Sequence, residues 1–264
     1  MKKIIYSSLF ALLTIGVFAQ EAADKKVQAG LVFGSGINFQ RMNTRNIDND
    51  GVGADLSVGA IVNIGFNNTV GFSTGLEFDF DGSNYKTTKA TYYEFNDTKI
   101  LRENESSSTS SIYRLSERNQ QAIYLTLPTM MIFRTNYIGY FRYFGKIGLR
   151  NSFLLSSKVN DKGIAYDPLG LPAEMENTSM KLNSGNDLLF YRGSVGLAGG
   201  AEWNFIGSTC LALEIGYYYG FTPLFYNTKE SKRFLFNQEP LGAREYINNV
   251  ATQSQLLFKL SILF

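Results

Sequence analysis

Residues 70–80, VGFSTGLEFDF, alternate strictly between two kinds of side chain. One face is apolar and aromatic apart from Thr74, and the other face is small, polar or acidic. A repeat of two residues is that of a β-strand, whose successive side chains point to opposite faces. A strand that crosses a membrane in a barrel turns its apolar face to lipid and its polar face inward. The stretch therefore favours a membrane-spanning strand.

Seven further segments show the same alternation. They are residues 27–39, 54–64, 122–134, 140–156, 190–205, 211–221 and 252–264. A soluble β-sandwich also alternates, so the pattern alone does not decide between a sandwich and a barrel. The alternation does predict an all-β protein with eight strands.

The lengths of the connections favour the barrel. The short connections are residues 66–68, 135–139 and 206–208. The long connections, which alternate with them, are about 40–50, 81–121, 157–187 and 222–249. Outer-membrane barrels have short periplasmic turns and longer external loops. We therefore predict an eight-stranded antiparallel transmembrane β-barrel with short periplasmic turns and long extracellular loops. Ten strands remain an alternative if the second long loop adds a hairpin.

The first residues, MKKIIYSSLFALLTIGVFAQ, have the features of a secretory signal peptide. Lys2 and Lys3 precede an apolar run that is too short for a comfortable transmembrane helix, and Ala19 is a small residue at the cleavage position. We predict a signal peptide over 1–19 and a barrel domain over 20–264, located in the outer membrane. Removing the leader takes two of the 25 basic residues and none of the 23 acidic ones. The balanced charge that remains gives no reason to expect a nucleic-acid partner.

Residue composition argues against catalysis. The chain has no histidine, which excludes Ser-His and Cys-His triads and histidine-ligated metal sites. Glu77 and Asp79 lie on one face and have the spacing of an acid–base pair, but nothing around them resembles a site. The stretch 48–51 is weakly similar to a calcium loop whose downstream glutamate is missing. We expect no enzyme activity, no catalytic residue, no cofactor and no metal. The lone Cys210 is expected as a half-buried strand residue.

The polar faces of the strands carry charges of both signs. Strand parity places ten of them inward: Asp55, Glu77, Asp79, Glu202 and Glu214, with Arg142, Lys146, Arg150, Arg192 and Lys259. An eight-stranded barrel is only wide enough for side chains to fill. Buried charges need partners, so we predict a salt-bridged plug. The alternative is a narrow path for an ion or solute.

The long loops and the turn ends carry further expectations. TYYEF (91–95) and SIYRL (111–115) are expected to pair as a strand extension beyond the membrane. The stretch 229–241, KESKRFLFNQEPL, is expected to fold over the barrel mouth. Aromatic side chains near the short turns fit an interfacial girdle. They are Phe66, Phe72, Phe133, Tyr137, Tyr140, Trp203 and Phe205.

Pro128 interrupts one of the best strands, AIYLTLPTMMIFR (122–134). Proline has no N–H to donate, and a closed barrel has no free edge on which to place it. We predict a β-bulge at Pro128, with a single missing ladder bond as the alternative.

The same strand carries a family resemblance. YLTLPTMMIF (124–133) resembles the tyrosine-leucine-glutamate-isoleucine-proline-leucine signature of the PorT-like outer-membrane β-barrel family of Bacteroidetes. Tyr124, Leu125 and Pro128 match it, whereas Thr126 and Thr129 replace its glutamate and a leucine. FGKIGLRNSFLL, GSVGLAGGAEW, EIGYYYGF and QLLFKLSILF are similar to the family's later strands in the same order. The resemblance implies a barrel but no particular activity, since the type IX secretion component that names the family is one specialised member.

The sequence thus predicts a non-enzymatic integral outer-membrane barrel with a filled lumen, acting in envelope structure or in partner binding through its loops. The alternative is a small transport or type IX secretion accessory barrel. Expected partners are outer-membrane lipid, the barrel-assembly machinery through the C-terminal strand ending at Phe264, and an unidentified extracellular partner. The sequence assigns no ligand-binding residue.

Overall fold

The computed structural model describes most of the chain. The described residues are 26–44, 46–97, 99–103, 105, 110–166, 178–183, 188–206, 209–225, 233–237 and 244–264. The predicted signal peptide and its cleavage site lie outside them. Within the described residues, no helix is long and apolar enough to span a bilayer.

Eight long strands form a closed ring. They are β1 (Val27–Met42), β3 (Gly53–Gly65), β4 (Val70–Asn96), β6 (Ser111–Arg134), β7 (Phe141–Tyr166), β9 (Tyr191–Ile206), β10 (Thr209–Gly220) and β13 (Ala251–Leu263). Each pairs antiparallel with the next, and β13 pairs with β1 from Gly30↔Leu263 to Met42↔Ala251, which closes the barrel. The predicted eight-stranded barrel is confirmed.

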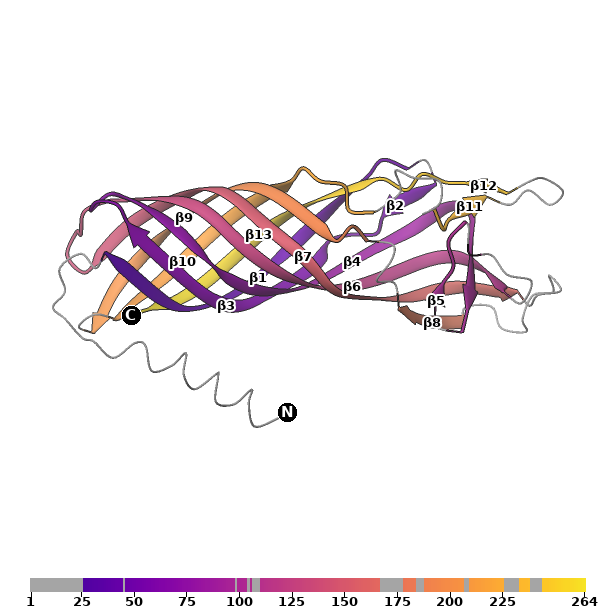
Figure 1. The fold of residues 1–264 in the computed structure, drawn as a ribbon, viewed down its shortest axis with the longest axis horizontal. Coiled ribbons are helices and arrows are strands. Elements are labelled where there is room, and N and C mark those ends of the chain that lie inside the picture. Colours follow the sequence, from indigo (N-terminus) through magenta and orange to yellow (C-terminus); the bar gives the residue numbers. More distant parts are fainter. Residues whose placement is uncertain are drawn as a thin grey trace, which may run out of the picture.

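Three of these strands continue far past the ring. In Figure 1, β4, β6 and β7 run on to the right, while the short turns and the C-terminus lie at the left end. The predicted pairing of TYYEF with SIYRL is confirmed, because Tyr93 of β4 lies opposite Tyr113 of β6. The long second connection thus lengthens two existing strands and adds none to the ring. We call this part, residues 83–96 of β4, 111–121 of β6 and 157–166 of β7, the extension.

Short strands flank the extension. They are β2 (Ile47–Asn49), β5 (Lys99–Ile100), β8 (Thr178–Asn183), β11 (Phe236–Asn237) and β12 (Glu245–Tyr246). β2, β5 and β11 pair with β4, β8 pairs with β7, and β12 pairs with β11. They gather at the right end of Figure 1 and widen the sheet there.

Local sequence explains the short turns. The Asn67 side chain accepts hydrogen bonds from the backbone N–H groups of Thr69 (2.9 Å) and Val70 (2.7 Å), so it forms a turn with its own chain. Gly139, in the turn before β7, has a φ of 65°, a conformation that glycine adopts without steric cost.

The outward face of the ring is apolar. Leu31, Leu56, Leu76, Ile147 and Leu213 are each at least 45% exposed, as lipid-facing side chains must be. Most of the predicted girdle also faces outward at the turn end: Phe66, Phe133, Tyr137, Tyr140 and Trp203 are exposed, whereas Phe72 is partly buried. The side chain of Phe205 lies outside the described part.

The predicted bulge at Pro128 is wrong. Thr129 pairs with Thr74 and Thr126 pairs with Glu77, so the register between β4 and β6 is the same on both sides of the proline. Gly75 and Leu76 have no partner on β6 there, while Pro128 still lies opposite Arg150 of β7. The missing N–H therefore interrupts one ladder without shifting it. A bulge does occur in β6, but it lies between Ile123 and Tyr124, in the pairing of β6 with β7.

Candidate functional site

All ten charged residues that parity placed inward lie inside the barrel. Nine are buried as whole residues, and the side chain of Glu214 is 7% exposed. Two more inward charges, Asp81 and Arg134, were missed, although each continues the parity of its strand. The prediction ended β4 at Phe80 and did not count the terminal residue of 122–134. The interior of the ring thus holds six acidic and six basic side chains, which we call the plug.

The centre of the plug is Arg150 of β7. Its Nη2 lies 2.6 Å from Asp79 Oδ2 and 3.1 Å from Glu77 Oε2. Lys259 Nζ lies 2.7 Å and 2.8 Å from the two oxygens of Glu77. Thr126 donates to Asp79. The two carboxylates of β4 therefore bind two cations and a hydroxyl, which come from three other strands.

Toward the extension, the plug continues around Asp81. Arg192 and Asn38 both hydrogen-bond to Asp81, and Gln253 Nε2 donates to it at 2.7 Å. Gln255 donates to Asp55. These amides supply hydrogen-bond donors to carboxylates that are buried inside the ring.

Toward the short turns, Glu202 is the common acceptor. Arg142 Nε lies 2.5 Å and Arg134 Nε 3.4 Å from its carboxylate oxygens. Both guanidinium groups also donate to Gln28 Oε1 at 3.0 Å. Lys146 Nζ lies 2.6 Å from Glu214 Oε2. Three cations of this end thus share two carboxylates, with Glu202 serving both arginines.

Aromatic rings fill space between the charges. The Arg150 guanidinium lies 4.9 Å from the ring centre of Tyr218, and that of Arg192 lies 4.1 Å from the ring of Tyr124. A side chain at Gly196 would place its Cβ 2.2 Å from the Tyr218 ring, so glycine is required for this ring to fit inside. The plug is therefore packed as well as paired.

The extension has a different centre, which the sequence analysis missed. Arg118 forms two hydrogen bonds to Asp161, from Nε to Oδ1 (2.7 Å) and from Nη2 to Oδ2 (2.6 Å), and neither side chain is exposed. Tyr93 donates to Asp161 Oδ2 at 2.7 Å. Burial and the adjacent carboxylate raise the pKa of Tyr93 well above its ordinary value. This phenol therefore stays a donor at any physiological pH.

An aromatic shell encloses this ion pair. The Arg118 guanidinium lies 5.8 Å from the ring centre of Tyr85, 5.3 Å from Tyr93 and 5.3 Å from Phe234. Phe234, Leu235 and Phe236 are at most 2% exposed. The expectation that the stretch 229–241 folds over the mouth is confirmed for its described residues, 233–237. Phe234 and Leu235 join a buried apolar cluster that includes Ile47, Tyr113, Leu115, Val159 and Phe225. Phe236 stacks on Tyr92.

The remaining predicted sites are engaged in other ways. Glu77 and Asp79 lie in the plug, where their carboxylates pair with Arg150. Asp50 of the calcium-like stretch lies 3.4 Å from Lys86 Nζ. Among the described residues, no group of three or more His, Cys, Asp or Glu side chains is arranged to hold a metal ion. Cys210 is 4% exposed, so it is buried inside rather than half-buried.

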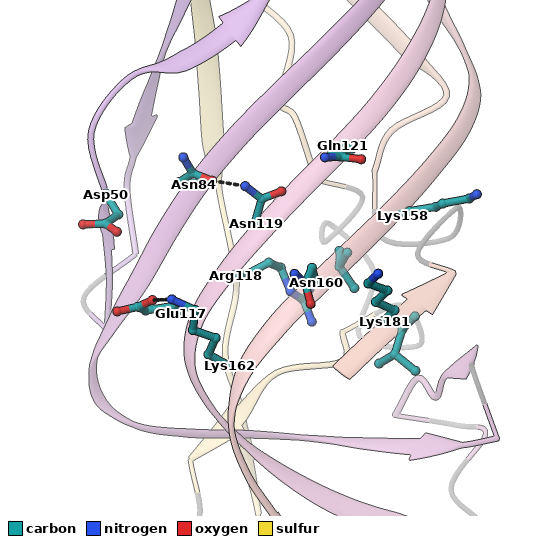
Figure 2. Close-up of a pocket in the computed structure, with 12 residues that line it drawn as sticks. Asp50, Asn84, Glu117, Arg118, Asn119, Gln121, Lys158, Asn160, Lys162 and Lys181 are labelled. Atoms are coloured by element: carbon teal, nitrogen blue, oxygen red, sulfur yellow. Dashed lines mark hydrogen bonds and ion pairs between the residues drawn. The ribbon is translucent and has the colours of Figure 1, made fainter. Parts of the chain in front are cut away.

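A groove of about 840 Å³ follows the outward face of the extension. Its lining is mostly polar and charged side chains of β4, β6, β7 and β8, several of which are labelled in Figure 2: Asn84, Glu117, Asn119, Gln121, Lys158, Asn160, Lys162 and Lys181. The buried Arg118, Val159 and Leu182 also border it. Its lining contrasts with the apolar outer face of the ring.

Comparison with known proteins supports the fold. Residues 18–226 match the family model described as an outer membrane protein beta-barrel domain. The chain is similar to Ail, the attachment invasion locus protein of Yersinia pestis, at 10% identity and a TM-score of 0.35, covering 91% of this chain and 100% of that one. It is also similar to OprG from Pseudomonas aeruginosa, at 8% identity and a TM-score of 0.39, covering 90% and 93%. No curated protein matches. The support for the fold comes from the family match alone, because structural likenesses at these TM-scores carry no argument.

Proposed function

The chain belongs to the outer membrane protein beta-barrel domain family, and we propose that it is a closed, non-enzymatic barrel that presents a rigid extracellular platform to a partner. The family match covers more than half of the chain and places the protein in the outer membrane. The plug is the evidence for a closed lumen, and the packed extension is the evidence for a rigid extracellular surface.

The observation that carries the proposal is the charge balance of the plug. Six acidic and six basic side chains share the interior of the ring. An unpaired buried charge costs several kcal/mol. Eleven of these twelve groups lie within 4.0 Å of an opposite charge, and Asp55 accepts a hydrogen bond from Gln255, so the interior resists opening. Arg150 illustrates this, because moving it would leave both Glu77 and Asp79 with fewer partners. An eight-stranded ring has little room for an aqueous channel beside such side chains.

The platform is supported by the core of the extension. Strands that only cross the membrane need about 9–11 residues, whereas β4 has 27 and β7 has 26. The added length encloses its own apolar cluster and the Arg118–Asp161 pair. A rigid, packed surface lowers the entropy cost of binding a partner.

The test is conductance. The chain without residues 1–19 would be refolded, its folding confirmed by heat-dependent gel mobility, and its current recorded across a planar bilayer. A silent barrel is expected. Reproducible open-channel steps would contradict the closed lumen and would favour the alternative, a small transport or type IX secretion accessory barrel.

A matched pair of variants sharpens this test. Tyr218→Ala removes a ring from between Arg150 and the lumen wall, and Tyr217→Ala removes a ring from the lipid-facing side of the same strand. The inward change is expected to give measurable leakage and the outward change none. Silence in both would show that the ion pairs alone close the lumen.

We also propose that the chain is exported through a cleaved signal peptide, is inserted by the barrel-assembly machinery and belongs to the PorT-like branch of the family. The signal peptide over 1–19 would be cleaved after Ala19, which the mass of the exported protein would check. The C-terminal strand ending at Phe264 would contact the barrel-assembly machinery, so a chain lacking Phe264 should accumulate unfolded. The PorT-like resemblance rests on Tyr124, Leu125 and Pro128.

A further inference from the structure

The outward face of the extension is a regular grid of polar residues. Strand register aligns Gln121 of β6 with Lys158 of β7 in one row. The next row out is Asn84, Asn119, Asn160 and Lys181. The third row is Lys86, Glu117 and Lys162. The groove of Figure 2 crosses these rows.

Charge is distributed unevenly over the grid. In the outermost row, Lys162 Nζ lies 3.0 Å from Glu117 Oε2, and Lys86 Nζ lies 3.4 Å from Asp50. In the two inner rows, neither Lys158 nor Lys181 forms an ion pair with any described residue. Two exposed ammonium groups therefore stand on adjacent rows of one sheet face, and no carboxylate of the described residues pairs with either.

Amide side chains surround these two lysines. Gln121 lies opposite Lys158, and Asn160 lies opposite Lys181. Asn119 Nδ2 donates to Asn84 Oδ1 at 2.7 Å, which fixes the orientation of the third amide. Ammonium and amide groups together supply the N–H donors that an anion with several oxygen atoms can accept.

The grid borders the lipid-facing band. Leu155 of β7 is 54% exposed and stands three residues before Lys158. On β6, the outward positions that follow Gln121 toward the ring are the apolar residues Ile123 and Leu125. At about 3.3 Å per residue, Lys158 lies roughly 10 Å along the tilted strand from Leu155. In a bilayer this is the level of the lipid headgroups.

We propose that the groove binds a phosphate group of an outer-leaflet lipid headgroup through Lys158 and Lys181. Charge complementarity selects an anion, and continuity with the lipid-facing band selects a membrane lipid as its source. Basic residues at the membrane surface attract anionic headgroups in this way. The inference rests on the proposed function, since it requires the extension to lie outside the outer leaflet.

The test uses lipid A with both phosphates, and the same lipid A after removal of its phosphates, as probes. The chain without residues 1–19 is refolded in an uncharged detergent, and binding of each probe is measured by native mass spectrometry. The double variant Lys158→Gln/Lys181→Gln is expected to weaken binding of the phosphorylated probe roughly thirtyfold, at about fivefold per lysine. Binding of the dephosphorylated probe should be unchanged.

The matched control is Lys86→Gln/Lys162→Gln, which removes the same charge from the outermost row of the same face. It is expected to weaken binding less than threefold. Equal losses in both double variants, or no loss in the first, would overturn the proposal. Inorganic phosphate serves as a competitor: displacement of the lipid at micromolar phosphate would show a site for the free anion instead of a headgroup.

The two proposals fail separately. Heat-dependent gel mobility confirms that each variant is folded before lipid is added. Channel steps in the conductance measurement would contradict the closed barrel and leave the lipid result standing. A silent barrel that ignores the phosphates of lipid A would contradict only the headgroup site.

Discussion

Within the membrane, the barrel is apolar outside and charged inside, whereas in the extension the two faces exchange their chemistry. On β6, Leu127 faces outward and Thr126 inward in the ring, while Asn119 faces outward and Leu115 inward in the extension. The same strands thus carry both patterns, and the exchange occurs within a few residues of Gln121.

The two regions differ because lipid surrounds the ring and water surrounds the extension. Lipid solvates apolar side chains outside the ring, so the interior receives the polar ones and must pair them. Water solvates the outside of the extension, so its interior can be the apolar core of an ordinary soluble sheet. The extension nevertheless buries one ion pair, Arg118–Asp161, inside that core. The plug spreads its charge over many partners, and the extension concentrates it in one pair.

The largest effect is expected from Arg118→Met. It leaves Asp161 charged and buried without the cation that pairs with it in the described structure. Breaking such a pair costs about 3–5 kcal/mol. The extension should become sensitive to limited proteolysis while the ring keeps its heat-dependent gel mobility. The double variant Arg118→Met/Asp161→Leu should recover most of the protection, and no recovery would show that the arginine acts through its aromatic contacts instead.

Leu127→Lys and Gln121→Lys locate the boundary between the two regions. Both residues are exposed on the same face of β6. A lysine facing the middle of the bilayer costs about 2–4 kcal/mol, and one near the membrane interface costs about 0–1 kcal/mol. Urea-induced unfolding in lipid vesicles should therefore separate the two variants. Equal stabilities would show that the outward face of β6 changes from apolar to polar at another position along the strand.

Asp79→Asn should have a smaller effect than Arg118→Met. Asp79 shares Arg150 with Glu77, and Thr126 still has an acceptor in the amide. Loss of a hydrogen bond to a charged group costs about 1.5–3 kcal/mol, measured by the same urea titration. A loss as large as that of Arg118→Met would show that the plug does not distribute its charge.

The smallest effect is expected from Pro128→Ala. Alanine restores an N–H where β4 and β6 lack a pair, which contributes about 1 kcal/mol. The more flexible unfolded chain offsets much of this gain. We expect a net change within about 1 kcal/mol of the original protein by urea titration. A loss above twice that value would mean that the buried proline ring itself fills the lumen.

Strand parity predicted the ring and most of the plug, but it missed the centre of the extension. The predicted strands ended where outward side chains stopped being apolar, so residues such as Arg118 and Asp161 were assigned to loops. Register shifts at Lys86/Thr91 and Leu115/Glu117 also break the parity there. A bulge adds a residue without any marker in the sequence, and so a period of two cannot be followed across it.

The sequence by itself determined the eight alternating segments, their lipid-facing side and ten of the twelve inward charges, because these depend only on which residues alternate along one strand. The tertiary structure decided which charges pair, since Arg150 meets Glu77 and Asp79 only through the register of three strands. It also decided that Phe234 covers Arg118 and that Lys158 and Lys181 share one face. Contacts between distant segments depend on register and bulges, and local periodicity carries no information about either.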